Sequence, residues 1–370
     1  MQKCLSPWHR IGKIHKERGN EGSTERDYHS GKEGIMRKRL FRKTLGVLLI
    51  LMFGIGLAGV FLGTKEVQAA SEKTRLSMGG SNTGTWIYMF CAIMVDVWKR
   101  YLPEVDITLM ATGGTTANYI PMSKGDIDLA GAATFGDYWA IHGMYFAKGS
   151  KITDFCSLIP ASKAFSHIFT YADSPIRTLK DLDGKRIHLG ARASPTSLVN
   201  EEIFKLLGVK PNYVYSTPNE AVDMVKDRRV DGMAYSVGAP WSIIMDIVTE
   251  RPIRFISLKP DEQKKIGDNL PYQVPDTIPA KTYSFQNEDY HTVMGLQNLI
   301  VRPGLSEDLA YKLTKVAWEH WDEVVKGTSA AKWVKAKDIV NMIAPIHPGA
   351  ARYYKEIGIQ IPDTLIWKKK

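Results

Sequence analysis

Two stretches rich in glycine and hydroxyl side chains contain the residues best suited to hold a small polar molecule. The first, Met78–Tyr88, follows a short strand-like run and leads into an amphipathic helical run. The second, Arg186–Thr196, repeats this layout later in the chain. Small residues at a strand-to-helix turn leave backbone N–H groups open, and a helix N-terminus favours an anion. The pair predicts two lobes that close on one small polar molecule.

Further turns supply additional candidates. Thr112–Thr116 ends a predicted strand, and two mirrored strands at 126–130 and 229–235 each open into a small-residue loop. In open α/β sheets, ligands gather at the carboxyl ends of the strands. These side chains could donate to a carboxylate, and ordinary capped turns are the alternative. The candidate ligand-binding residues are Ser81, Asn82, Thr83, Tyr88, Thr112, Gly114, Thr115, Thr134, Arg192, Ser194, Thr196, Ser197, Ser236 and Val237.

Larger side chains near these turns could complete the site. Arg192 could pair with an anionic ligand, because a planar guanidinium binds a carboxylate through two parallel hydrogen bonds. A solvated loop arginine is the alternative. The aromatic rings of Trp86, Tyr138, Trp139 and Trp241 could wall the site or belong to the core.

The sequence offers no constellation for catalysis. His347 has no Ser, Cys or carboxylate pattern beside it, so we interpret His347–Gly349 as the start of a helix. No zinc-type spacing occurs. We therefore expect no catalytic residue, no metal site and no cofactor.

Local signals delimit the elements that must position the turns. Ser194 followed by Pro195 is a helix start, and that helix should end near Gly208. Thr217–Glu220 has the pattern of a capping box, with proline at the first helical position. Strands alternate with helices through both halves of the chain. This alternation predicts a parallel α/β sheet in each half.

The basic excess lies mostly in a targeting segment. Residues 1–69 hold 13 Lys or Arg and 6 Asp or Glu, so they carry 7 of the 10 net positive charges. We interpret residues 36–69 as a signal peptide with a basic N-terminal region, an apolar run and small residues at the predicted cleavage site. Residues 1–35 would then be a possible mis-start, translated from a codon upstream of the true one. A retained membrane anchor is the alternative. The remaining charge implies no basic face and no nucleic-acid partner. We expect Cys91 and Cys156 to be buried free thiols.

Taken together, the motifs resemble the TAXI family of solute-binding proteins of TRAP transporters. The resemblance spans nearly all of residues 74–360. It is carried by the turn at 79–88, Ala111–Thr115, Gly125–Ala130, Gly190–Thr196, Ile278–Tyr283 and His347–Ala350.

The resemblance implies a type II periplasmic-binding-protein fold, an α/β fold of two lobes with a ligand cleft between them. One lobe would be 70–165 plus 255–370 and the other 166–254, with hinges near 165–170 and 250–256. It also implies an exported, extracytoplasmic protein that is not an enzyme. Such a protein would deliver a small organic anion, glutamate-like or dicarboxylate, to TRAP permease membrane subunits. A ligand-sensing subunit and an enzyme on the same fold are the alternatives.

Overall fold

The computed structural model describes residues 73–83 and 85–368. The predicted signal peptide at 36–69 and the upstream segment 1–35 lie outside these residues. Within the described part of the chain, no helix combines the length and the apolar character needed to cross a lipid bilayer.

The first lobe is built on three parallel strands. The sheet order is β2-β1-β3-β10, in which β10 is antiparallel to β3. The strands are β1 (Thr74–Gly79), β2 (Val105–Met110), β3 (Leu129–Ala133) and β10 (Tyr290–Val301). The helices are α2 (Trp86–Tyr101), η1 (Thr115–Asn118), α3 (Tyr119–Lys124), α4 (Thr134–His142), η2 (Tyr145–Ala147), α9 (Glu307–Glu319), α10 (Trp321–Gly327), η4 (Ser329–Trp333), η5 (Ala336–Asn341), α11 (Pro348–Glu356) and η6 (Asp363–Leu365).

The second lobe repeats this topology. Its sheet order is β4-β7-β5-β6, with β5, β6 and β7 parallel and β4 antiparallel to β7. The strands are β4 (Cys156–Tyr171), β5 (Arg186–His188), β6 (Asn212–Val214), β7 (Gly232–Val237), β8 (Ile253–Phe255) and β9 (Val274–Ile278). The helices are η3 (Leu179–Leu182), α5 (Pro195–Leu207), α6 (Pro218–Lys226), α7 (Ser242–Glu250) and α8 (Pro260–Asn269). The predicted two-lobed α/β fold is confirmed.

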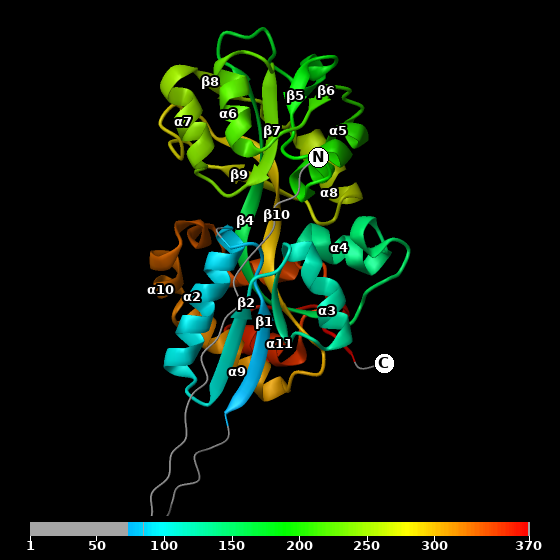
Figure 1. Ribbon diagram of the computed structural model, residues 1–370, viewed down its shortest axis with the longest axis vertical. Coiled ribbons are helices and arrows are strands. Elements are labelled where there is room, and N and C mark those ends of the chain that lie inside the picture. Colours follow the sequence, from blue (N-terminus) through cyan, green and yellow to red (C-terminus); the bar gives the residue numbers. More distant parts are fainter. Residues whose placement is uncertain (1–72, 84, 369–370) are drawn as a thin grey trace, which may run out of the picture. The chain divides into compact units, whose positions relative to one another are not determined.

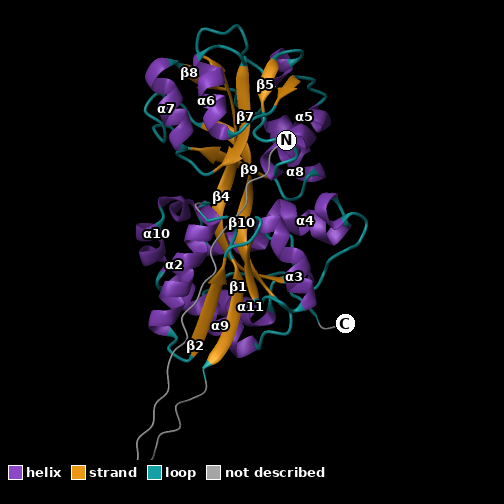
Figure 2. Ribbon diagram, viewed as in Figure 1, coloured by secondary structure: helices purple, strands orange, loops and turns teal. Residues whose placement is uncertain are grey.

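Two long strands, β4 and β10, run through both lobes and pair with each other (Figure 2). Their register shifts twice, between Gln297 and Asn298 and between Leu299 and Ile300. The second hinge predicted near 250–256 is wrong. That segment holds β8, which pairs with the second-lobe end of β4. The strand that returns to the first lobe is β10.

The buried side chains do not divide by lobe. One cluster runs from the first lobe along the crossing strands to α6 and α7 of the second lobe, and another joins Leu189 and Phe204 to Ile266 and Tyr272. Helix α8 packs against α5, and strand β9 packs against α8, so both lie with the second lobe beyond the boundary that the sequence suggests at 254. The predicted domain limits themselves stay a prediction.

Several local predictions are confirmed. Ser194 caps α5, which ends at Gly208 in the left-handed conformation, and Thr217 forms a capping box with Glu220. Cys91 and Cys156 are buried free thiols. His347 caps α11, because its Nδ1 accepts from Gly349 N at 3.2 Å. That interaction is structural, as the sequence indicates.

Candidate ligand-binding site

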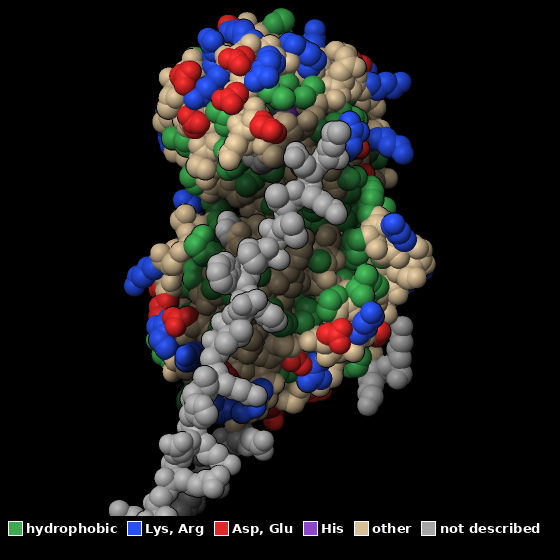
Figure 3. All heavy atoms as spheres, in the orientation of Figure 1, with side chains coloured by type: hydrophobic (Ala, Val, Ile, Leu, Met, Phe, Trp, Pro, Cys, Tyr) green, Lys and Arg blue, Asp and Glu red, His purple; other side chains and the backbone are tan. Residues whose placement is uncertain are grey.

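A pocket of about 380 Å³ lies between the lobes, at the carboxyl ends of the parallel strands. On the face shown in Figure 3, charged side chains gather on the outer surfaces of the lobes, while the uncovered parts of the hollow between them show hydrophobic side chains together with backbone and uncharged polar side chains. The first-lobe wall consists of Ser81, Asn82, Thr85, Trp86, Ile87, Gly113, Gly114, Thr115, Thr116, Ala133 and Phe135.

The turn after β1 brings the N-terminus of α2 to the pocket. Thr85 caps the helix, since its Oγ1 accepts from Tyr88 N at 3.4 Å. Ser81 is buried, and its carbonyl oxygen accepts from Thr112 N at 3.0 Å, which ties this turn to the one after β2. A side chain at Gly80 would lie 2.7 Å from the Tyr88 ring. The close approach explains why glycine is needed there.

Helix α4 also begins at the pocket, and no side chain caps it. Its N-cap residue is Ala133, so the first backbone N–H groups lack the usual hydroxyl or carboxylate acceptor. Thr134 points instead toward the crossing strand. Its Oγ1 accepts from Leu296 N at 3.1 Å and donates to the carbonyl oxygen of Tyr272 at 3.3 Å.

The second-lobe wall is organised by the N-terminus of α5. Ser194 Oγ accepts from Ser197 N at 3.3 Å, and Thr196 Oγ1 accepts from Ser236 N at 2.8 Å. The second bond ties the turn after β5 to strand β7. The wall consists of Ser194, Pro195, Thr196, Val199, Tyr235, Ser236 and Gln273.

A buried relay holds the Tyr235 ring in the wall. Tyr235 stacks on Trp241 with ring centroids 4.6 Å apart. Trp241 N donates to Tyr283 OH at 2.9 Å, and that hydroxyl donates to His167 Nε2 at 2.8 Å. His167 Nδ1 donates to the carbonyl oxygen of Phe165 at 2.9 Å. Burial lowers the pKa of His167 to about 4, so the ring is neutral and can accept from Tyr283.

The crossing strands form the floor. Ala164 comes from β4, and Gly295, Leu296 and Gln297 come from β10. Gln297 Oε1 accepts from Ser162 Oγ at 3.2 Å, which leaves its amide N–H₂ group for the pocket. The nearby Lys163 is paired with Asp276 at 2.8 Å.

The pocket is electropositive without a charged side chain. None of the described residues that line it is Lys, Arg, Asp, Glu or His. Burial raises the pKa of Tyr235, so its hydroxyl stays neutral. The N-termini of α2, α4 and α5 supply the positive potential, because each helix carries roughly half a positive charge at that end. The described residues also contain no group of three or more potential metal ligands.

The structure brings half of the candidate residues together at this pocket. Ser81, Asn82, Gly114, Thr115, Ser194, Thr196 and Ser236 line it. The others lie outside the lining: Thr83, Tyr88, Thr112, Thr134, Arg192, Ser197 and Val237. Arg192 is exposed, and its guanidinium carbon lies 4.1 Å from the centroid of the Tyr215 ring. Binding by any of these residues stays a prediction.

Sequence reasoning missed the polar groups of the floor and of the far wall. Gln273 and Gln297 lie on strands or loops without a local motif, and pairing between distant strands brings them to the pocket. Of the four aromatic residues considered, Trp86 lines the pocket, whereas Tyr138, Trp139 and Trp241 do not.

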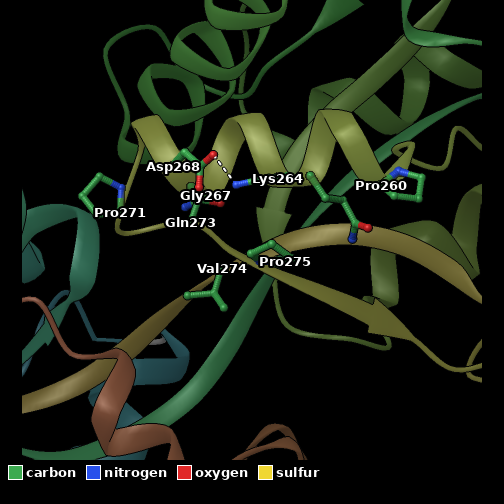
Figure 4. A pocket seen from close by; sticks show the side chains of 9 residues that line it. Pro260, Lys264, Gly267, Asp268, Pro271, Gln273, Val274 and Pro275 are labelled. Atoms are coloured by element: carbon green, nitrogen blue, oxygen red, sulfur yellow. Dashed lines mark hydrogen bonds and ion pairs between the residues drawn. The ribbon is translucent and has the colours of Figure 1, made fainter.

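A second cavity lies beside α8 and β9 (Figure 4). This outer groove holds about 470 Å³ and is lined by Pro260, Pro271 and Pro275, with the Lys264–Asp268 ion pair at 2.7 Å along its edge. Gln273 lines both the outer groove and the interlobe pocket. The groove receives no N-terminus of α2, α4 or α5.

Several solved structures are similar to this chain. One is the probable amino-acid ABC transporter extracellular-binding protein of Bacillus subtilis, at 12% identity and a TM-score of 0.44, covering 71% of this chain and 98% of that one. Another is the periplasmic aliphatic sulphonate binding protein of Escherichia coli, at 12% identity and 0.42, covering 77% and 90%. A third is the alkanesulfonate-binding protein of Xanthomonas axonopodis pv. citri bound to MOPS, at 13% and 0.42, covering 81% and 100%.

The sequence itself places the chain in a family. The sequence model described as the NMT1-like family matches residues 78–358, which is more than half of the chain and includes every residue that lines the pocket. The chain belongs to the NMT1-like family.

Proposed function

We propose that this protein is an extracytoplasmic solute-binding protein that captures a small organic anion between its lobes and passes it to a membrane transporter. One observation carries the proposal. Three helix N-termini meet at an interlobe pocket that has no charged side chain among its described lining residues. Backbone N–H groups at helix N-termini are suited to bind a carboxylate or a related anion.

The motif resemblance to TAXI proteins suggests the transporter class. A TRAP permease is therefore the first partner to test, and a glutamate-like or dicarboxylate anion is the first ligand. Closure of the lobes about β4 and β10 would enclose the solute and present a loaded shape to the permease. Binding without turnover is the expected activity.

A ligand screen tests the proposal. A solute that binds only the folded protein raises the melting temperature by mass action, and titration calorimetry then gives its dissociation constant. We expect organic anions to bind, and the bound anion to be recovered unchanged by NMR. Binding only of neutral or cationic compounds would contradict the proposal, and conversion of the anion would favour an enzyme.

Uptake into proteoliposomes tests the partner. Each vesicle carries either a TRAP-type or an ABC-type permease encoded beside this chain, and the purified protein is added outside with labelled solute. We expect uptake that needs an ion gradient and no ATP. Uptake driven by ATP would contradict the TRAP assignment but keep the solute-binding function. A genomic neighbour that is a kinase instead of a permease would favour a sensing role.

A further inference from the structure

We infer that the pocket takes a monoanion, with one carboxylate or sulfonate group on a compact apolar body that also carries an uncharged hydrogen-bonding group. This inference rests on the proposed function and narrows it to a ligand class. It departs from the dicarboxylate and glutamate-like ligands that the family resemblance implies. Three features of the pocket carry it: its helix N-termini, its apolar lining and its neutral polar wall.

The helix N-termini accommodate one anionic group. The N-termini of α2, α4 and α5 lie at this pocket, and the N-terminus of α4 is buried and lacks a capping side chain. The first turn of a helix leaves backbone N–H groups without partners. A single oxyanion can accept from these groups together with the hydroxyls of Thr115 and Thr196.

A second charge on the ligand would find no countercharge. The nearest basic side chain on the floor strand, Lys163, is already paired with Asp276, and Arg192 stacks on Tyr215 in an exposed loop. No described lining residue is Asp or Glu, so the ammonium group of an amino acid has no carboxylate partner. A buried charge without a partner is strongly disfavoured. The lining therefore discriminates against dianions and zwitterions.

The remaining lining of the pocket suits an apolar body. Trp86, Ile87 and Phe135 contribute apolar surface from the first lobe, and Val199 does so from the second. Leu296 adds to this surface from the floor. Aromatic and aliphatic walls of this kind favour a hydrocarbon chain or ring over a hydrated polar body.

Gln273 supplies the neutral polar wall. Its side chain is only 2% exposed, and its Oε1 accepts no hydrogen bond from a described residue. A buried amide oxygen without a donor is costly, so a rotation of the amide that brings Oε1 to a hydroxyl or amide on the ligand would be favoured. The Gln273 Nε2 lies 3.1 Å from the position that a Cβ at Gly295 would occupy, at the pocket floor. Gln273 also lines the outer groove.

A ligand series of constant chain length tests the inference by calorimetry. The probes are hexanoate, hexane-1-sulfonate, 6-hydroxyhexanoate, adipate and 6-aminohexanoate, with glutamate added. We expect a monoanion to bind at least about tenfold more tightly than adipate, 6-aminohexanoate and glutamate, because the second charge is unpaired. We also expect 6-hydroxyhexanoate to bind more tightly than hexanoate. The carboxylate and the sulfonate distinguish between the two possible anionic groups.

The outcomes separate this inference from the proposed function. Tighter binding of adipate or glutamate than of any monoanion would overturn the inference and leave the solute-binding function intact. Binding of no anion at all would overturn both.

Substitutions at Gln273 give an independent test. Gln273→Lys should reverse the preference, so that adipate binds more tightly than hexanoate, because the new ammonium pairs with the second carboxylate. Gln273→Leu should abolish the advantage of 6-hydroxyhexanoate and leave hexanoate binding intact. Asn269→Lys adds the same charge at an exposed position of α8, outside the interlobe pocket, and serves as the control. Melting temperatures report whether each variant is folded. An unchanged ligand order in folded Gln273→Lys and Gln273→Leu proteins would overturn the role of this wall.

Discussion

The two lobes share a topology but contribute unequally to the pocket. Each has three parallel strands joined to an antiparallel crossing strand. The first lobe provides eleven lining residues and two helix N-termini, whereas the second provides seven lining residues and one helix N-terminus. This imbalance suggests that the solute first docks on the first lobe, and that the second lobe closes over it.

The difference arises at the third strand of each lobe. β3 ends at Ala133 and α4 begins at the next residue, so the helix N-terminus stays at the pocket. β7 ends at Val237, but α7 begins only at Ser242. The intervening loop carries Trp241 away from the pocket, where it supports the Tyr235 ring. A few extra residues thus replace a helix N-terminus at the pocket with a loop that supports the Tyr235 ring.

Two buried groups, one in each lobe, should respond to pH in opposite directions. In the first lobe, burial raises the pKa of Asp137 to about 7, while Tyr119 OH at 2.7 Å and Asn298 Nδ2 at 3.0 Å oppose part of that shift. A carboxyl whose folded pKa is raised holds its proton longer than in the unfolded chain. Its contribution to stability is therefore lost as the pH rises from about 4 toward 7. In the second lobe, burial lowers the pKa of His188, so stability is lost as the pH falls below the usual histidine range.

Asp137→Asn tests this contrast and should give the largest effect. Wild type should lose stability relative to the variant as the pH rises from about 4 to 7. The free energy of unfolding of the variant minus that of wild type should increase by on the order of 4 kcal/mol over this range and then level off. Urea unfolding at several pH values measures it. His188→Gln serves as the comparison, with its relative gain at low pH. A constant difference across the range would contradict the pH assignment for the first lobe.

A new carboxylate in each lobe tests their unequal roles in binding. Ser81 is buried and Ser194 is half-buried, so Ser81→Asp should weaken anion binding by about 2–3 kcal/mol and Ser194→Asp by about 1 kcal/mol. Aspartate keeps the cap of α5, which limits the structural change at Ser194.

The neutral variants Ser81→Asn and Ser194→Asn serve as matched controls in the same titrations. Equal losses for the two aspartate variants, beyond those of their asparagine controls, would remove the distinction between docking and closing.

The uncapped end of α4 offers a smaller and sharper test. Ala133→Ser adds a hydroxyl that can accept from the first N–H groups of α4, as Ser194 does at α5. The anion then loses one donor, and its affinity should fall by about 1 kcal/mol. Ala132→Ser, one residue earlier on β3, is the control for adding a hydroxyl to a buried site. Unchanged affinity in a folded Ala133→Ser protein would argue against ligand contact with α4.

Arg192→Ala should have the smallest effect. The guanidinium lies over Tyr215 in an exposed loop and does not line the pocket, so the affinity for an anion should change by less than about 0.5 kcal/mol. A loss of 1.5–3 kcal/mol, the range for a paired guanidinium at a ligand, would instead support the role that the sequence suggested for Arg192.

The sequence predicts those features that depend on neighbouring residues. The cap at Ser194 and the capping box at Thr217 depend only on contacts with the residue three positions later, so both can be recognised in the sequence. The floor residues Leu296 and Gln297 reach the pocket through pairing with β4, more than 100 positions earlier, which no local pattern records. The position of Arg192 is hidden for the same reason, since Tyr215, over whose ring its guanidinium lies, is on the other side of α5 in the chain.

The pairing of β4 with β10 has a mechanical consequence. Two separate hinges would allow the lobes to swivel freely, but here the two connections are hydrogen-bonded to each other along most of their length. Relative motion of the lobes must therefore twist a two-stranded ribbon, and the hydrogen bonds between its strands resist that twist. The register shifts beside Asn298 and Ile300 lie where β10 is also paired with β3, so the twist should concentrate at Gly295 and Leu296, which pair with β4 alone. Opening and closing would then follow one preferred path.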